Sequence, residues 1–333
     1  MKSFYLINEK TSKTIFISFF IAIFFTYFDS ILEYTYGITI KDRSGYLLHF
    51  QNIDNEISLL TKNFSYMSLF NESLYYPSLY FLDKIYFFGL QSIDKIIFIT
   101  SFTFSFYIIR YAKLNIFTKI IILFFCEIII TNYANALRQG FASSFFLVGF
   151  FSRSKYLKII LFIFATQIHY LFFIPLILIF ITYILNKFNI SLNKKNFKKS
   201  VIAFIILFFI SFYFLENILT LNISLYNNYL PNIAKLNFNL LQVFMFFIFL
   251  SIYFLNIFDQ KTFFVLLILL FYLFFSVIFS PVSRLPMALS PLILIESSYA
   301  IKSNKHISLI WSSYSLYMII NLFLNENLNN ISN

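Results

Sequence analysis

The chain has 333 residues, of which 60% are hydrophobic and only 12% charged, with 25 lysines and arginines against 14 acidic residues. A soluble domain carries roughly 25% charged residues, so this composition excludes an ordinary water-soluble core and predicts an all-α polytopic membrane protein. The single cysteine, Cys126, excludes an internal disulfide and any multi-cysteine metal site.

The first apolar run covers residues 14 to 28 and follows a lysine-containing N-terminus. Because no small-residue cleavage site comes after it, we interpret it as an uncleaved first span with the N-terminus inside. Residues 29 to 92 then form the largest polar segment, in which acids outnumber cations. Apolar periodicity at 45 to 50 and 74 to 90 predicts helices lying along the membrane. We therefore expect a large first extracytoplasmic loop with a functional role.

Most of the cations fall into six clusters along the chain. Cytoplasmic loops collect lysine and arginine, so we place all six clusters on the cytoplasmic side. The chain must then cross the membrane an even number of times between one cluster and the next. The clusters are Lys2/Lys10/Lys13, Arg110/Lys113/Lys119, Arg153/Lys155/Lys158, Lys187/Lys194/Lys195/Lys198/Lys199, Lys261 and Lys302/Lys305.

The apolar runs between these clusters predict a series of hairpins within a single membrane domain over residues 1 to 333, with about eleven spans and the C-terminus outside. Several runs are shorter than the ~20 residues that cross a bilayer core. Residues 158 to 185 could instead form one tilted span kinked near Pro175, which would reverse the topology after it. The runs after the first outer loop are 93 to 109, 117 to 137, 140 to 152, 157 to 168, 170 to 186, 200 to 216, 239 to 257, 262 to 280, 285 to 300 and 307 to 324, with a second outer loop at 217 to 238.

Three isolated polar residues, Arg138, His169 and Arg284, fall at the outer tips of three different predicted hairpins. An arginine holds a phosphate oxygen pair bidentately, and a histidine can orient or deprotonate a hydroxyl near neutral pH. Each could instead anchor a helix end at the interface. A shared site at the outer membrane face explains all three positions together.

Further features support Arg138 and Arg284 as site residues. Asn132, Asn135 and Gln139 lie three or four residues apart along the predicted 117–152 pair, which predicts a polar stripe on one helix face with Arg138. Gly140 allows a backbone to approach closely or ends the helix. Arg284 lies between two prolines at a predicted broken helix end.

Five short elements occur in one order along residues 1 to about 300. They are Asp42 and Tyr46 in "IKDRSGYLLHF", Glu72 with Tyr75 and Tyr76 in "NESLYY", and then "LRQGFASSFFL", "QIHYLFFIPLIL" and "SRLPMALSPLI". This ordered set resembles the EpsG-type members of the O-antigen and exopolysaccharide polymerases, the Wzy-like proteins. One departure is Gly37, which lies five residues before Asp42 instead of two.

The resemblance implies an enzyme of the bacterial inner (cell) membrane that polymerises oligosaccharide repeat units carried on undecaprenyl diphosphate. A growing glycan would move from its lipid diphosphate onto another lipid-linked unit, while arginines stabilise the leaving diphosphate. The implied partners are the two lipid-linked glycans, membrane lipid and a chain-length regulator, with no nucleic acid, cofactor or metal. Together, the predicted topology and the resemblance give His169, Arg138 and Arg284 as candidate catalytic residues. The candidate substrate-binding residues are Asp42, Tyr46, Glu72 and Tyr75 from the resembling elements, and Asn135 and Gln139 from the predicted polar stripe.

Three alternatives remain open. Another lipid-linked glycosyltransferase or an O-antigen ligase shares the topology, although such transferases often present paired acids in the first outer loop and here the acids are spaced. A polysaccharide flippase or transporter would show internal repeats and mid-membrane polar sites, for which only Glu127 is a candidate. A membrane acyltransferase would need an early histidine with an acidic partner, a setting that His49 lacks.

Overall fold

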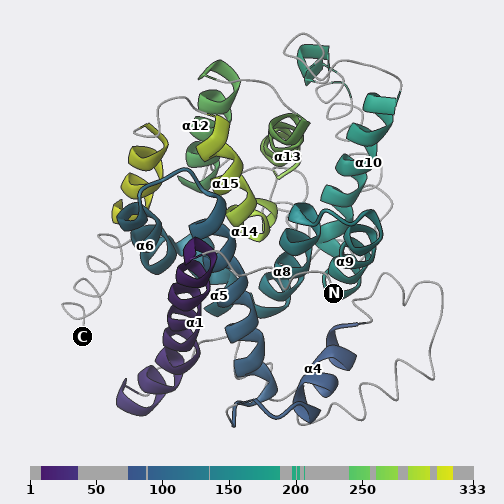
Figure 1. Cartoon of the computed structure of the whole chain (residues 1–333). Coiled ribbons are helices and arrows are strands. Elements are labelled where there is room, and N and C mark those ends of the chain that lie inside the picture. The colour runs from purple at the N-terminus through teal and green to yellow at the C-terminus, as the bar shows by residue number, and fades with distance from the viewer. Residues whose placement is uncertain are drawn as a thin grey trace, which may run out of the picture. The chain divides into compact units, whose positions relative to one another are not determined.

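The computed structural model describes residues 9–36, 74–87, 89–134, 136–187, 197–199, 201–202, 206, 240–255, 260–276, 284–300 and 306–317. Every regular element within these residues is a helix, which confirms the all-α prediction (Figure 1). The chain divides into two compact units, Met1–Phe172 and Phe173–Asn333. The prediction of a single membrane domain stays a prediction.

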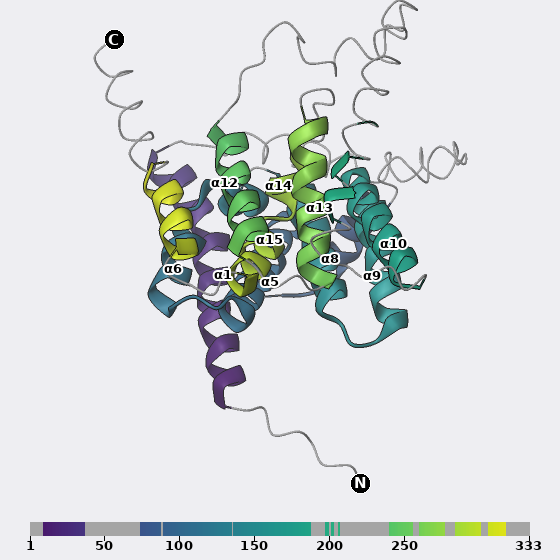
Figure 2. The same ribbon diagram turned by 90° about the horizontal axis from the view of Figure 1, so that it is seen from above.

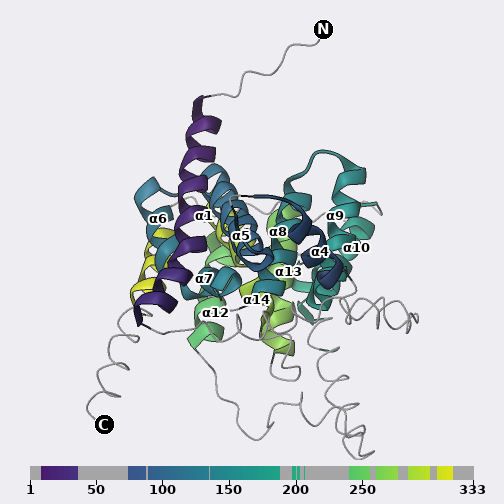
Figure 3. The same cartoon turned by 90° about the horizontal axis from the view of Figure 1, so that it is seen from below.

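In the first unit, α5 is the central helix. It packs against α1, α4, α6, α7 and α8, and α1 lies along it in both Figure 1 and Figure 3. Its side chains, including Phe104 and Ile108, are accordingly buried on most sides. The helices of this unit are α1 (Glu9–Tyr36), α4 (Tyr75–Lys84), α5 (Ser92–Tyr111), α6 (Ile116–Phe125), α7 (Glu127–Ala134), α8 (Leu137–Phe151), α9 (Lys155–Ile168) and the 3₁₀ turn η2 (Tyr170–Phe172).

Local capping chemistry explains where several of these helices begin. The Asn115 side chain accepts a hydrogen bond from the backbone N–H of Thr118 at 2.7 Å at the start of α6. The Ser154 hydroxyl does the same for Leu157 at 3.4 Å at the start of α9. At α5, the backbone N–H of Gln91 donates to the Asp94 carboxylate at 3.3 Å as part of a capping box. Each cap satisfies an N–H group that has no partner within its helix.

Helices α8 and α9 form an antiparallel pair joined by residues 152–154. Phe146 stacks on Phe162 at 4.8 Å between ring centroids, and Phe145 contacts Phe164 at 6.0 Å. This register brings the first turn of α8 to the level of the last turn of α9. The two ends that carry Arg138 and His169 are therefore the same end of the pair.

In the second unit, α13 is the central helix and lies between α10 and α12 in both Figure 1 and Figure 2. Every side chain from Phe263 to Leu270 is buried. A helix over residues 306–317 packs Trp311 edge-on against Phe244 of α12 at 5.2 Å. The remaining elements are α10 (Phe173–Lys187), α12 (Leu240–Leu255), α13 (Gln260–Phe275), α14 (Leu285–Ala288) and α15 (Ser290–Ala300).

Two helical stretches among the described residues are long and apolar enough to cross a membrane, Lys10–Phe28 and Ser92–Tyr111. They contain the predicted spans 14 to 28 and 93 to 109. Shorter apolar helical stretches cover Ile116–Phe125, Tyr170–Ile184, Leu241–Phe254 and Lys261–Phe275. The count of eleven spans and the orientation of the chain stay predictions.

The predicted span 117 to 137 is wrong as one continuous helix. It is divided into α6, which ends at Phe125, and α7, which begins at Glu127. The backbone of Cys126 is extended, with φ −83° and ψ 104°. An acid is favoured in the first turn of a helix because the dipole there is positive, so a new helix begins readily at Glu127.

A second break separates α9 from α10. The helix ends at Ile168, and η2 occupies Tyr170–Phe172 before α10 begins at Phe173. The interruption therefore lies before Pro175, which is inside α10. A break here is what the hairpin prediction for residues 157 to 186 requires, whereas the direction of α10 relative to α9 stays a prediction.

Candidate functional site

Three segments of the first unit meet at one end of the α8–α9 pair. The backbone N–H of Leu74, just before α4, donates to the carbonyl oxygen of Gln167 in α9 at 3.2 Å. The guanidinium carbon of Arg138, in the first turn of α8, lies 5.5 Å from the ring centroid of Tyr75, over its face. Arg138 and Tyr75 were both predicted to be site residues, and the fold brings them into contact.

A helix break determines where Arg138 lies. Helix α7 ends at Ala134 and α8 begins at Leu137, so the predicted polar stripe on one continuous helix face is wrong. The side chains of Asn132 and Gln139 nevertheless meet across the break. The Gln139 amide donates to the Asn132 side-chain oxygen at 3.1 Å, and the Asn132 amide donates to the Ile128 carbonyl at 3.0 Å.

Both amide side chains of this link are buried, with Asn132 fully enclosed and Gln139 2% exposed. A buried amide costs free energy when its hydrogen bonds are lost, so the pair stabilises the angle between α7 and α8. Gln139 thus acts on Arg138 through the helix that carries it. Its direct contact with substrate stays a prediction.

Gly140 allows the two helices to approach this closely. A Cβ at this position would overlap the backbone carbonyl of Asn132 and would lie 3.0 Å from Cγ2 of Thr100 in α5. The Gly140 N–H donates to the carbonyl of Ala136 at 2.8 Å, which closes the first turn of α8. The "RQGFA" element therefore combines a charged residue with the two residues that hold it in place.

The stacked arrangement suits Arg138 for binding an anion. An arginine lying over an aromatic face within about 6 Å gains cation–π stabilisation. The five N–H donors lie in the guanidinium plane, so stacking on its face leaves their directions toward the edge unchanged. Arg138 is half-buried whereas Tyr75 is 1% exposed. The ring thus forms a fixed platform that limits the rotamers of the arginine.

His169 lies at the end of α9 and is 9% exposed. Its Nδ1 accepts a hydrogen bond from the backbone N–H of Leu171 at 3.2 Å. With Nδ1 as an acceptor, the neutral imidazole carries its proton on Nε2. Nε2–H is then a hydrogen-bond donor, and the ring in this tautomer is suited to orient an oxygen atom more than to remove a proton from it.

Arg284 belongs to the second unit. It is exposed and precedes the four-residue helix α14, whose second residue is Pro286, and α15 begins at Ser290 after a break at Leu289. The break at Leu289 divides the predicted span 285 to 300, so that span is wrong as one continuous helix. A helix end between Pro281 and Arg284 stays a prediction, because residues 277–283 lie outside the described residues. The described contacts join Arg138, Tyr75 and the end of α9, and the convergence of Arg284 on them stays a prediction.

Four predicted site residues, Asp42, Tyr46, Glu72 and Asn135, lie outside the described residues. The same holds for the second predicted outer loop, residues 217 to 238, and for most of the first. Within the part of the chain that the structure describes, no three His, Cys, Asp or Glu side chains could hold a metal ion together.

Sequence reasoning missed a polar clasp that holds α4 in place. Lys95, which is 5% exposed, donates to the carbonyl of Leu82 at 2.7 Å, and the Ser92 hydroxyl donates to Asp83 at 3.3 Å. Both contacts join α4 to the first turn of α5. A single lysine within the apolar run 93 to 109 was the available signal, because a buried cation requires partners. Through α4, the clasp positions Tyr75.

No protein-family model matches the chain, and no curated protein or solved structure is significantly similar to it.

Proposed function

We propose that the chain is a multi-pass glycosyltransferase of the bacterial inner membrane that joins undecaprenyl-diphosphate-linked oligosaccharide units into O-antigen or exopolysaccharide at the outer face. The observation that carries this proposal is the Arg138 guanidinium over the Tyr75 ring, 5.5 Å from its centroid, at the end of the α8–α9 pair that also bears His169. A preorganised arginine and a hydrogen-bond donor are what transfer from a lipid diphosphate needs.

The surface of the helices supports a membrane environment. Large apolar side chains are exposed in rows along α1, α9 and α10, and monomeric soluble proteins rarely expose such continuous apolar area. On α1, for example, Phe16 and Phe20 are 64% and 55% exposed. The exposed large apolar residues of these helices are Ile15, Phe16, Phe20, Phe24, Tyr27, Phe28, Tyr156, Leu157, Ile159, Ile160, Ile163, Phe164, Ile177, Phe180, Ile181 and Tyr183.

In the proposed reaction, a hydroxyl of the acceptor unit attacks the anomeric carbon of the donor glycan, and the bond from that carbon to the lipid diphosphate breaks. Negative charge grows on the departing diphosphate. Arg138 stabilises this charge, because a guanidinium fixed before the reaction costs no reorganisation during it. Arg284 supplies the second cation in this proposal.

His169 has an orienting role in the proposed reaction. Its Nε2–H donates to an oxygen of the acceptor or of the diphosphate, which aligns the reacting atoms. The proton of the attacking hydroxyl is taken by another base. Asp42 and Glu72, which belong to the first predicted outer loop, are the candidates for this role and for sugar binding together with Tyr46.

The proposal is tested by deleting the gene and examining the surface glycan on a gel. Loss of a polymerase leaves single repeat units that are made, exported and attached, with no ladder of longer chains. A ligase would instead leave long chains on the lipid carrier, and a flippase would leave single units at the inner face. A normal ladder in the deletion strain, with no second polymerase gene present, would falsify the proposal.

A further inference from the structure

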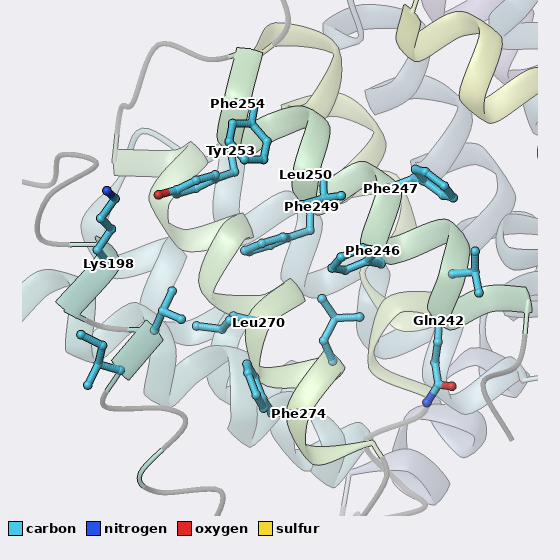
Figure 4. A pocket seen from close by; sticks show the side chains of 14 residues that line it. Lys198, Gln242, Phe246, Phe247, Phe249, Leu250, Tyr253, Phe254, Leu270 and Phe274 are labelled. Carbon is cyan, nitrogen blue, oxygen red and sulfur yellow. The ribbon is translucent and has the colours of Figure 1, made fainter. Parts of the chain in front are cut away.

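A groove in the second unit lies between α12 and α13 and has a volume of about 790 Å³. Figure 4 shows that its polar side chains are at its ends. Lys198 and the hydroxyl of Tyr253 lie toward one end, and Gln242 lies at the other. Between them the lining consists of aromatic and aliphatic side chains such as Phe246, Phe249 and Leu270.

The Lys198 end of the groove is cationic. Phe197 contacts the rings of Tyr253 at 5.9 Å and Phe263 at 5.5 Å, so the helical segment 197–199 packs where α12 ends and α13 begins. Lys198 and Lys199 are both exposed there, and Lys261 is the second residue of α13. This end therefore attracts a negatively charged group.

The rest of the groove excludes polar occupants. A sugar or a peptide would bring hydroxyl, N–H and C=O groups that need hydrogen-bond partners, and burying them without partners costs free energy. The side chain of Gln242 already donates to the Ser276 hydroxyl at 3.2 Å. A hydrocarbon chain has no such requirement and fits a lining of this kind.

The length of the groove matches one leaflet of a bilayer. Gln242 and Phe254 are twelve residues apart on α12, which corresponds to about 18 Å along the helix. Half of a hydrocarbon core is roughly 15 Å. The rim is also apolar, since Phe247 and Phe254 are 55% and 66% exposed. A chain can thus enter from the surrounding lipid.

We propose that this groove binds one anionic glycerophospholipid of the surrounding bilayer, with its phosphate at Lys198 and one acyl chain along Phe246, Phe249 and Leu270. A net negative head group is favoured because Lys198 and its neighbouring lysines carry positive charge. The inference goes beyond glycosyl transfer, because it requires only that the chain lies in a bilayer. The glycan reaction can fail its own test without affecting the groove.

Native mass spectrometry of the full-length protein in detergent tests the proposal. Phosphatidylglycerol and phosphatidylcholine with the same acyl chains are titrated separately. The unaltered protein binds phosphatidylglycerol more tightly, and Lys198→Gln weakens that binding about fivefold, the effect of one basic residue near an anionic surface. Lys199→Gln removes the same charge one position away, outside the groove lining, and weakens the binding less than Lys198→Gln does.

A second pair of variants tests whether the acyl chain lies in the groove. Leu270→Trp fills the groove and lowers the binding of both lipids. Phe117→Trp enlarges a side chain of α6 that is 70% exposed in the other unit, and it leaves binding unchanged. Equal binding of the two lipids by the unaltered protein would overturn the proposal, as would equal losses from Lys198→Gln and Lys199→Gln. Displacement of phosphatidylglycerol by an equal concentration of undecaprenyl phosphate would also overturn it, because the occupant would then be the lipid of the substrate.

Discussion

The α-carbon of Gly140 packs directly against the backbone carbonyl of Asn132, with no room for a side chain between α8 and the end of α7. The backbone of α7 cannot move aside as a side-chain tip can. This contact therefore fixes the position of the start of α8 relative to the end of α7. It also fixes the position of Arg138, two residues before Gly140.

Replacing Gly140 by alanine is expected to destabilise the protein by about 1–3 kcal/mol, the usual cost of overpacking, and to reduce activity by displacing Arg138. Gly149→Ala is the matched control on the same helix. Its Cβ would lie 2.9 Å from Cε1 of Phe162, a contact with side-chain atoms that is less severe than the overlap with the backbone of Asn132 at Gly140. Thermal unfolding in detergent should show the larger loss for Gly140→Ala, and equal losses would contradict the role of this contact.

Arg138→Lys is expected to lose most polymerisation while membrane insertion and expression stay normal. Lysine keeps the charge but lacks the planar fork for two phosphate oxygens. Loss of such a contact costs about 2–4 kcal/mol, or tens- to hundreds-fold in rate. Glycan chain length on a gel is the readout. Arg284→Lys should behave alike if both arginines serve one diphosphate, and full activity in Arg138→Lys would reduce Arg138 to an interfacial anchor.

Tyr75 is expected to act through its ring. Tyr75→Phe keeps an aromatic face under Arg138 and should retain most activity, whereas Tyr75→Leu removes the face at similar burial. The cation–π contribution is about 0.5–2 kcal/mol, so Tyr75→Leu should lower the rate by up to about thirtyfold. Combining Tyr75→Leu with Arg138→Lys separates the two effects. An additive double variant would show that the ring does not act through Arg138.

His169→Gln and His169→Asn distinguish the two ring nitrogens. A glutamine can place an amide donor near the position of Nε2, whereas an asparagine can replace only Nδ1 as the acceptor for the Leu171 N–H. If Nε2–H orients an oxygen, His169→Gln keeps more activity than His169→Asn, and His169→Ala keeps the least. The reverse order, measured as initial rate of chain formation, would assign the function to Nδ1.

The orientation of the α8–α9 pair is open to a direct test. A reporter fused after Arg153, in the connection between the two helices, is expected to lie inside the cell. A reporter fused after Gln167, in the last turn of α9, is expected to lie outside. If both fusions report the inside, the hairpin is wrong and the shared outer site is lost with it.

The sequence by itself determined helices such as α5 and α9, because the signals that make a helix are local. Apolar runs predicted 93 to 109 and 157 to 168, and the structure has α5 at Ser92–Tyr111 and α9 at Lys155–Ile168. Caps at Gln91 and Ser154, each within three residues of the group that it satisfies, explain the close agreement. The motif "LRQGFA" also identified Arg138 from local sequence, because an arginine within an apolar, membrane-buried segment costs free energy and usually has a function there.

Only the tertiary structure decided how these residues meet. The contact of Arg138 with Tyr75, the link from Gln139 to Asn132 across a helix break and the clasp of Lys95 on Leu82 all join separate helices. The sequence also did not predict the helix break at Cys126, because the apolar run continues through this residue whereas the helix does not. Periodicity reports which face of a helix is apolar, and it carries no information on which distant segment covers that face. Packing makes that choice, because each polar side chain that leaves solvent must find its partner on whichever helix the fold brings beside it.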